Sequence, residues 1–385
     1  MIGVCIKYFH KNYGGMLQAY ATISELERRN LPYELIRYQK QRTPQVILWN
    51  LPRFLNRVFL NDKYEVLLKK LGELCHPEFA RHERVWEEAF HRFQEQCFTR
   101  LSPEFAGYRA LCDGAKRYTT VLTGSDQLWS PAGLPTNFYN LMFVPDNIRK
   151  VSYASSFGVS RIPWYQKKRT ARFLARLDHI SMRENRGTEI VCELTGRDAP
   201  TVLDPVLLFD RQGWEKLIPV RQEVNEPYIF AYFLGANPKH REAVRRAAKE
   251  MHCKIVTLRH LDRYVPGDEE FGDIALYDVA PDRFLNLLRG AMGVCTDSYH
   301  GVCFSVLHRK PFIAFDRYAN DTGISKNSRL DSLCLNLGLE DRRYDPALPV
   351  ASQLLAPVDH DRVERKLGKL RALSMRYLDN ALGSE

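Results

Sequence analysis

The sequence lacks several features that would place it in a simple class. It has no run of about 18 apolar residues, so no segment is expected to cross a membrane. Its first stretch, MIGVCIKYFH, has no basic leader region or cleavage site, so we expect no signal peptide and a cytoplasmic protein. The nine cysteines form no C-x-x-C pair, and most are therefore expected to be reduced core residues rather than metal ligands or a redox pair.

Signatures of nucleic-acid binding are also missing. The sequence has no zinc-finger spacing, no RNP-like aromatic motif and no continuous basic helix, so we expect no nucleic acid partner. The formal net charge is nevertheless +10 and the pI is about 9.1. This charge favours phosphorylated or carboxylated substrates, or an anionic membrane surface.

Strand-like and helical patterns alternate along the chain. With 385 residues, 45% of them hydrophobic and 26% charged, the protein has the composition of a globular chain and the length of two domains. The first domain is predicted over residues 1–210 as a doubly wound parallel sheet. Its strands are expected at Ile2–Tyr8, Tyr33–Tyr38, Tyr118–Leu122, Val151–Ala154, Ile180–Met182 and Thr201–Leu203.

A second α/β domain is predicted over residues 225–345. Its strands are expected at Tyr228–Leu234, Lys254–Leu258, Val294–Thr296 and Pro311–Phe315. Residues 357–385 have helical spacing and are expected to cross back to the first domain. The predicted architecture is two Rossmann-like domains with a cleft between their strand ends.

A helical insertion is predicted at about residues 45–100. Its first part, Val46–Leu60, is apolar and aromatic and carries Arg53 and Arg57, which is typical of an interfacial segment. A helix docked on its own domain would have the same pattern. Peripheral contact with an anionic membrane therefore stands as a hypothesis.

One stretch late in the chain, Ala291–Phe315, has the pattern of a strand, a polar loop and a buried helix. His300 and Gly301 lie where the helix begins, and helix N-termini at strand ends attract anionic ligands. His300 is either a ligand group or a helix cap. Other predicted strand ends are followed by Asn12, Gly14, Gly15, Ser125, Asp126, Gln127, Ser155, Ser156, Arg183 and Glu184.

Several motifs taken together resemble the polysaccharide pyruvyl transferase family. Each is weak alone, but they occur in the family's order over roughly residues 2–340. They are NYGGMLQAYA at Asn12–Ala21, GSDQLW at Gly124–Trp129, YASSFG at Tyr153–Gly158, SMRE at Ser181–Glu184, VLDPVLL at Val202–Leu208 and TDSYHGVCFSVL at Thr296–Leu307.

This resemblance implies a GT-B-like, two-domain enzyme of bacterial surface polysaccharide biosynthesis. It implies transfer of the enolpyruvyl group of phosphoenolpyruvate to a sugar, which forms a pyruvate ketal and releases phosphate without a further cofactor or metal. The acceptor would be a sugar or a lipid-linked oligosaccharide. An enzyme acting on a lipid-linked acceptor would work on the inner face of the cell membrane.

The resemblance also implies roles for residues. His300 would protonate the methylene carbon of phosphoenolpyruvate or hold its phosphate, Arg183 would grip the donor, and Asp126 would activate the acceptor hydroxyl. The alternatives for Arg183 and Asp126 are a structural salt bridge and an Asx turn. Substrate-binding roles are expected for Ser298, Tyr299, Gly301, Asn12, Gly14, Gly15, Ser125, Gln127, Ser155, Ser156, Glu184 and Arg329.

Two other functions fit the same sequence. One is a GT-B glycosyltransferase that uses a nucleotide sugar, because a fold does not fix a chemistry. The other is a non-catalytic protein that binds carbohydrates or polyanions through its positive charge.

Overall fold

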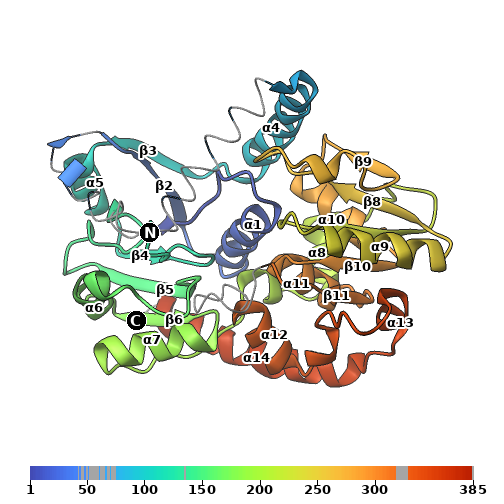
Figure 1. Cartoon of the computed structure of the whole chain (residues 1–385). Helices are drawn as coiled ribbons and strands as arrows, with labels where there is room; N and C mark the ends of the chain where they lie inside the picture. The colour runs from blue at the N-terminus through green and yellow to red at the C-terminus, as the bar shows by residue number, and fades with distance from the viewer. Residues whose placement is uncertain are drawn as a thin grey trace.

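The computed structural model describes residues 1–41, 75–133, 136–317 and 328–383, with a few single residues between 43 and 70. Within these ranges the chain forms two parallel β-sheets, each flanked by helices (Figure 1). The predicted arrangement of two doubly wound α/β domains is therefore confirmed.

The first sheet has the order β3-β2-β1-β4-β5-β6, and its strand pairs are parallel. The strands are β1 (Ile2–Cys5), β2 (Tyr33–Gln39), β3 (Leu101–Ala106), β4 (Thr120–Thr123), β5 (Arg149–Ser155) and β6 (His179–Met182). Its helices are α1 (Tyr13–Arg28), α4 (Pro77–Cys97), α5 (Tyr108–Ala115), α6 (Lys167–Ala175) and α7 (Asn185–Thr195). The order reverses between β1 and β4, and ligands collect at such switch points.

The second sheet has the order β11-β10-β7-β8-β9 and is also parallel. The strands are β7 (Tyr228–Tyr232), β8 (Lys254–Leu258), β9 (Ile274–Leu276), β10 (Gly293–Thr296) and β11 (Phe312–Ala314). The helices are α8 (Arg211–Leu217), α9 (Pro238–Glu250), α10 (Pro281–Gly290), α11 (Tyr299–Leu307), α12 (Ser328–Leu337), α13 (Val350–Leu355) and α14 (His360–Leu382). Its switch point lies between β7 and β10.

The structure differs from the predicted strands at three places. The edge strand β3 was not predicted because it contains Pro103. Proline disfavours a strand inside a sheet but is tolerated at a sheet edge. The half-buried edge strand β9 has only three residues, Ile274, Ala275 and Leu276, so its apolar run is short. The predicted strand Thr201–Leu203 is wrong, because it forms only a bridge from Thr201 to Met182 before a turn at Pro205–Leu207.

Part of the predicted helical insertion lies outside the described residues. This is the case for most of residues 45–74, including Arg53 and Arg57. The remainder contains α4, whose Trp86 Nε1 donates a hydrogen bond of 3.0 Å to the Tyr13 hydroxyl. Among the described residues, no helix is long and apolar enough to span a membrane.

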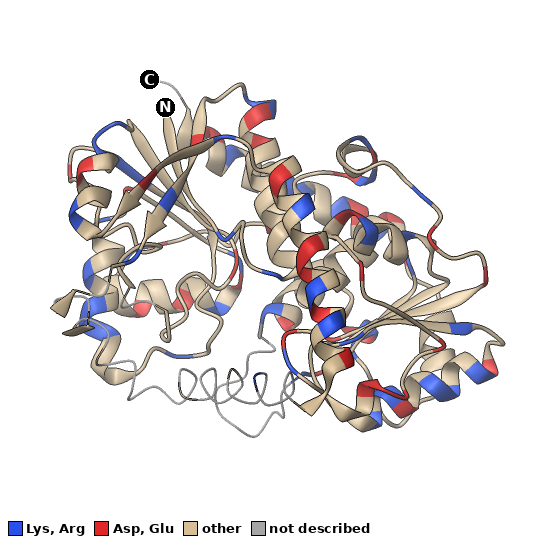
Figure 2. Ribbon diagram, turned by 90° about the horizontal axis from the view of Figure 1, so that it is seen from above, with Lys and Arg blue, Asp and Glu red and all other residues tan. Residues whose placement is uncertain are grey.

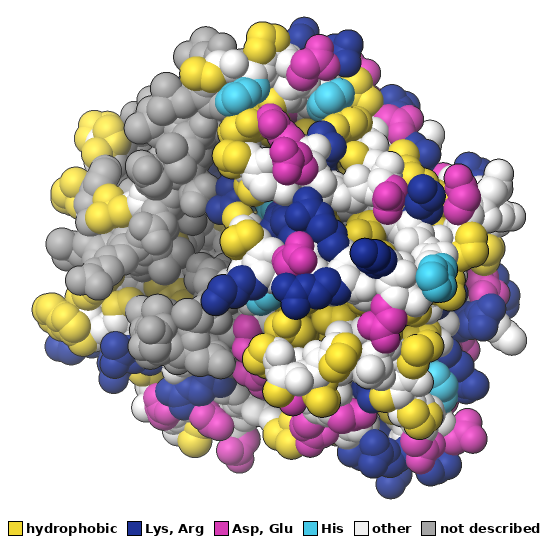
Figure 3. Space-filling view, turned by 45° about the vertical axis from the view of Figure 1, so that its right-hand side comes forward, with side chains coloured by type: hydrophobic (Ala, Val, Ile, Leu, Met, Phe, Trp, Pro, Cys, Tyr) yellow, Lys and Arg dark blue, Asp and Glu magenta, His cyan; other side chains and the backbone are white. Residues whose placement is uncertain are grey.

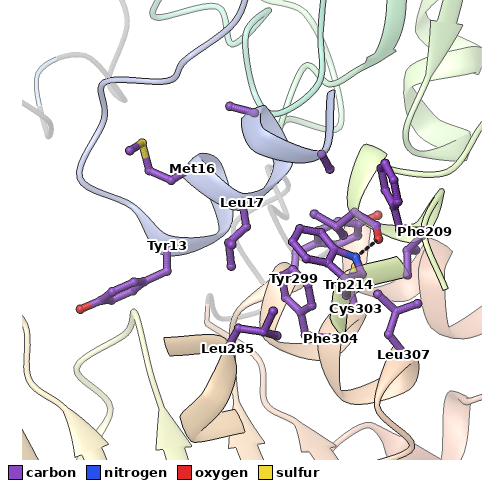
Figure 4. Close-up of a cluster of buried hydrophobic side chains, with 14 of the residues drawn as sticks. Tyr13, Met16, Leu17, Phe209, Trp214, Leu285, Tyr299, Cys303, Phe304 and Leu307 are labelled. Atoms are coloured by element: carbon purple, nitrogen blue, oxygen red, sulfur yellow. Dashed lines mark hydrogen bonds between the residues drawn. The ribbon is translucent and has the colours of Figure 1, made fainter. Parts of the chain in front are cut away.

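Helix α1 lies between the two sheets and packs on both domains. The Tyr13 ring stacks on Phe284 of α10, with ring centroids 4.8 Å apart. Further along α1, Leu17 faces a buried cluster that includes Tyr299 and Trp214 (Figure 4). The core of the second domain therefore continues into α1, which fixes the position of the loop that precedes this helix.

The C-terminal helix α14 returns to the first sheet. The Tyr377 hydroxyl donates to the carbonyl oxygen of Ser152 on β5 at 2.7 Å. The Ser374 hydroxyl oxygen accepts from the backbone N–H of Leu203 at 2.9 Å. Helix α14 thus connects the two domains, and Arg29 at the end of α1 also pairs with Asp379 of α14 at 2.5 Å (Figure 1).

Charged side chains of both signs are interspersed on the helices of both domains (Figure 2). On the face in Figure 3, Lys and Arg side chains gather near the centre, around an acidic side chain. The net positive charge is thus spread over both domains rather than confined to one helix.

Candidate active site

A cavity of about 520 Å³ lies between the two domains, where the switch points of both sheets face each other. The loops after β1 and β4 form one wall, and those after β7 and β10 form the other. The lining residues are Lys7, His10, Asn12, Lys40, Asp126, Gln127, Leu128, Ser130, Ala132, Gly133, Thr136, Tyr139, Leu234, Ser298, Tyr299, His300, Arg317 and Arg329.

The start of α11 carries His300 into this cavity. Ser298 is the N-cap residue of the helix, and its hydroxyl accepts a hydrogen bond from the N–H of Gly301 at 3.3 Å. The Thr296 hydroxyl oxygen accepts from the N–H of Ser298 at 3.0 Å. Because the whole helix is buried, the backbone around His300 is held rigidly.

The loop after β1 ends before the two glycines, which were predicted to lie in a loop beyond the strand. Helix α1 begins at Tyr13, so Gly14 and Gly15 lie in its first turn and neither has a positive φ. Asn12 is the N-cap, accepting from the N–H of Gly15 at 2.8 Å. A β-carbon at Gly14 would overlap the His300 ring, so this glycine is needed for the close approach of α1 to α11.

Asp204 connects three of the predicted site residues. Its Oδ2 accepts from Nη1 of Arg183 at 2.6 Å and from the Ser125 hydroxyl at 3.0 Å. The same oxygen lies 3.4 Å from Nε2 of His300. Burial alone would raise the pKa of this carboxyl, but the charges of His300 and Arg183 outweigh it and hold the pKa well below its usual range.

Arg183 lies behind the cavity rather than on its surface. Its side chain is 0% exposed, with Nη2 at 3.5 Å from Oδ1 of Asp126. Its guanidinium carbon lies over the Tyr299 ring, 4.6 Å from the centroid. The structure therefore places Arg183 where it fixes Asp204, Asp126 and Tyr299, and the alternative of a structural salt bridge is present, with Asp204 as the partner.

Asp126 lies in the loop after β4 and lines the cavity. Its φ is 65°, a left-handed conformation that aspartate adopts more readily than most residues. Burial would raise its pKa, but Lys7, with Nζ 3.9 Å from Oδ2, and Arg183 hold the pKa well below its usual range. Asp126 is thus an ionised carboxylate at neutral pH.

Among the described residues, Arg329 and Arg317 are the two arginines that line the cavity. When the Gln127 amide is turned so that its oxygen faces Arg329, this oxygen accepts from Nη1 of Arg329 at 2.8 Å. Its guanidinium carbon is 6.0 Å from the centroid of the Tyr299 ring. Burial, with the charge of Arg183 adding to it, lowers the pKa of Arg329 to about 10, so it remains a cation.

Five other predicted site residues support the cavity without lining it. The Ser156 hydroxyl donates to Oε1 of Glu184 at 2.9 Å, and burial raises the pKa of this carboxyl. Ser155 accepts from the Ser152 hydroxyl at 2.8 Å. The group comprises Ser125, Ser155, Ser156, Glu184 and Gly301.

The sequence patterns missed Asp204, Lys7, His10, Lys40 and Arg317 as site residues. Burial and the charge of Lys7 lower the pKa of His10 to about 4, so its imidazole is neutral at neutral pH. Asp204 stands in the VLDPVLL motif after a predicted strand, which is the signal that could have found it. His10 follows the predicted first strand and had the same signal, whereas Lys7 was predicted inside that strand, which in the structure ends at Cys5. Among the described residues, no group of three His, Cys, Asp or Glu side chains could hold a metal ion.

The chain is similar in structure to a UDP-N-acetylglucosamine 2-epimerase, with a TM-score of 0.51 and 14% identity over 99% of this chain and 94% of that one. The UDP-GlcNAc 2-epimerase from Neisseria meningitidis has a TM-score of 0.49 and 9% identity over 99% and 93%. The likeness to the first of these supports a GT-B-like fold and nothing further. The comparison with curated protein sequences gave no match.

The family model for polysaccharide pyruvyl transferases matches residues 12–318. This range begins at the N-cap of α1 and includes Asp126, Arg183, Asp204 and His300. The chain therefore belongs to the polysaccharide pyruvyl transferase family and is a transferase.

Proposed function

We propose that this protein transfers the enolpyruvyl group of phosphoenolpyruvate to two hydroxyls of a sugar, forming a pyruvate ketal and releasing phosphate. The observation that carries the proposal is the presence of an imidazole, an ionised carboxylate and a guanidinium on one cavity between the domains, from His300, Asp126 and Arg329. The reaction needs a proton donor, a proton acceptor and a clamp for an anion, and these groups can supply them.

The donor would lie against the second domain. Phosphoenolpyruvate carries a phosphate and a carboxylate, and Arg329 and Arg317 both line this side of the cavity. The N–H groups at the start of α11 add a partial positive charge there. Arg183 would act through the residues that it fixes, because its side chain has no exposed surface.

In the first step His300 donates a proton to the methylene carbon, which becomes a methyl group, and the neighbouring carbon gains oxocarbenium character. The acceptor hydroxyl then forms a bond from its oxygen to that carbon and loses its proton to Asp126. A second hydroxyl then forms a bond to the same carbon and loses its proton to His300, which gave up its own in the first step. The carbon–oxygen bond to phosphate breaks at the same time, which closes the ketal and releases phosphate. Asp126 is a weak base because its pKa is low, but a hydroxyl becomes strongly acidic as it attacks such a carbon.

The acceptor would lie against the first domain, near Lys7, Lys40 and Asn12. We propose a sugar of a lipid-linked oligosaccharide in surface polysaccharide assembly, with the enzyme at the inner face of the membrane. The described apolar residues of the predicted interfacial segment are exposed, as that location requires: Ile47, Leu48, Leu51 and Leu60.

The test is to incubate the purified chain with phosphoenolpyruvate and candidate oligosaccharide acceptors, and to measure phosphate release and the mass gain of a ketal. A panel of nucleotide sugars, without phosphoenolpyruvate, tests the glycosyltransferase alternative. Full turnover by His300→Ala would refute the role of this histidine. Asp126→Asn should lose turnover and still bind phosphoenolpyruvate.

A further inference from the structure

A second cavity, of about 440 Å³, lies in the second domain at the carboxyl ends of β8 and β9. The residues that directly follow these strands, Arg259 and Tyr277, are on its wall, and the beginning of α4 closes it from the other side. Its lining residues are Cys75, His76, Pro77, Glu78, Phe79, His82, Arg259, His260, Leu261, Tyr264, Val265, Asp268, Glu269 and Tyr277. It shares no lining residue with the first cavity.

The wall of this second cavity already stacks planar nitrogen rings. The imidazole of His82 lies on the Tyr277 ring with centroids 3.6 Å apart and an interplanar angle of 9°. The imidazole of His76 lies on the Tyr264 ring at 3.8 Å and 15°. The chemistry of the wall therefore suits a flat heteroaromatic ring, which can stack on these side chains.

The second cavity is also lined by a buried histidine, His260, whose Nε2 has no hydrogen-bond partner among the described residues. The His260 side chain is 3% exposed, and its Nδ1 lies 2.7 Å from Oδ2 of Asp268. Nε of Arg241 donates to the other oxygen of Asp268 at 3.1 Å, so the carboxylate is held in place. Because a carboxylate oxygen only accepts, Nδ1 of His260 is the donor of this bond, and Nε2 lies on the opposite side of the ring.

Among the described residues, Nε2 of His260 has no hydrogen-bond partner, and neither does Nε of the adjacent Arg259. The rest of the Arg259 guanidinium is fixed, since it donates to the Tyr277 hydroxyl and to the Glu269 carbonyl oxygen, both at 2.8 Å. A buried donor or acceptor without a partner destabilises the folded protein. A ligand that accepts from one atom and donates to the other would remove both costs.

We propose that this second cavity is a binding site for a nucleobase. A nucleobase is flat, stacks on tyrosine and histidine, and presents an N–H donor beside an acceptor on one edge. The donor would meet Nε2 of His260 and the acceptor would meet Nε of Arg259. The site is separate from the transfer reaction proposed for the first cavity, and its test measures binding alone.

The experiment is isothermal titration calorimetry of the full-length chain with uridine and adenosine, and with ribose as a probe without a base. We expect saturable binding of the nucleosides at one site per chain and none of ribose. 3-Methyluridine, whose N–H is blocked, should bind about tenfold more weakly than uridine. Phosphoenolpyruvate should not displace uridine.

Three variants identify the site. Tyr277→Leu removes a stacking face and should weaken binding about tenfold or more. Tyr277→Phe keeps the ring and should bind within about threefold of the parent chain, because it loses only the bond to Arg259. His260→Asn keeps a donor toward Asp268 but lacks Nε2, so it should bind uridine about tenfold more weakly. This variant tests the site even if Tyr277→Leu does not fold.

The matched control is Tyr165→Leu, a partly exposed tyrosine of the first domain outside both cavities, which should bind normally. The proposal is overturned if no nucleoside binds saturably. It is equally overturned if folded Tyr277→Leu and His260→Asn bind uridine as the parent does, or if phosphoenolpyruvate competes with uridine.

Discussion

Gly14 and His300 are in direct contact across the boundary between α1 and α11. A β-carbon at Gly14 would lie 2.6 Å from the β-carbon of His300 and would overlap Nδ1 of its ring. Since Nε2 of His300 faces Asp204, the imidazole is held between a carboxylate and a bare backbone. The glycine of α1 thus sets the position of a side chain from the other domain.

Gly14→Ala should therefore displace His300 and lower turnover by about 100-fold, because a shift of about 1 Å in a reacting group has an effect of that size. Helix propensity alone would favour alanine by up to about 1 kcal/mol. The measurement is kcat with phosphoenolpyruvate, together with a thermal melt. Gly15→Ala is the control, since its β-carbon would approach no atom closer than 3.3 Å. Equal activity of the two variants would contradict the proposed contact.

Asp204→Asn should lower both turnover and stability. It leaves the buried guanidinium of Arg183 without its closest carboxylate. Removing one partner of a buried ion pair lowers the free energy of unfolding by about 3–5 kcal/mol. We expect kcat to fall about 100-fold, because His300 and Asp126 both lose support. Activity assays and urea unfolding measure the two effects.

The control for this change is Asp210→Asn. Asp210 is the exposed N-cap of α8, where asparagine caps equally well, so neither activity nor stability should change by much. If Asp204→Asn behaved like this control, Asp204 would have no part in positioning the site.

Arg329→Lys tests the donor clamp. Lysine keeps the positive charge but lacks the planar fork that holds a phosphate or carboxylate in two places. We expect the KM for phosphoenolpyruvate to rise about tenfold with a smaller change in kcat, as for a residue that binds the ground state. Arg246→Lys on the exposed face of α9 is the control. A loss of kcat at constant KM would instead assign Arg329 to the chemical step.

Much of the fold could be predicted from local patterns. The buried strands of both sheets are short apolar runs, and small or polar residues follow them, so the cavity loops at Asn12, Asp126 and His300 could be found without the structure. The reason is that a parallel sheet brings the carboxyl ends of its strands to one edge. The edge strands β3 and β9 give a weaker signal, because β3 contains a proline and is mostly exposed, and β9 has only three residues.

The roles of Asp204 and Arg183 could not be predicted in the same way. Asp204 stands 21 residues from Arg183 along the chain, and only the packing of α11 brings His300 to it as well. Arg183 has the residue type of a ligand clamp, but its neighbours cover it completely. Likewise, the sequence around Gly14 predicts a loop, but Gly14 lies in α1, where the absence of a side chain allows the close contact with His300.

His308 should make the folded state sensitive to mild acid. It follows α11, is 6% exposed, and Nε of Arg289 lies 3.3 Å from its Nε2, which must therefore be an unprotonated acceptor. Burial and the charge of Arg289 lower its pKa to about 3, against about 6.5 in an unfolded chain. Below pH 6.5 the unfolded state thus binds a proton that the folded state does not.

The contribution of His308 to the free energy of unfolding should consequently fall by about 1.4 kcal/mol per pH unit as the pH drops from about 6 to 4. His308→Gln keeps an acceptor for Arg289 but does not titrate, so the variant should lose stability less steeply than the parent. Urea unfolding at pH 7.5, 6.5, 5.5 and 4.5 measures the difference. His91→Gln, at a mostly exposed position of α4, should leave the slope unchanged. Parallel pH profiles for the parent and His308→Gln would show that His308 is protonated in the folded state, and its bond from Arg289 would then be ruled out.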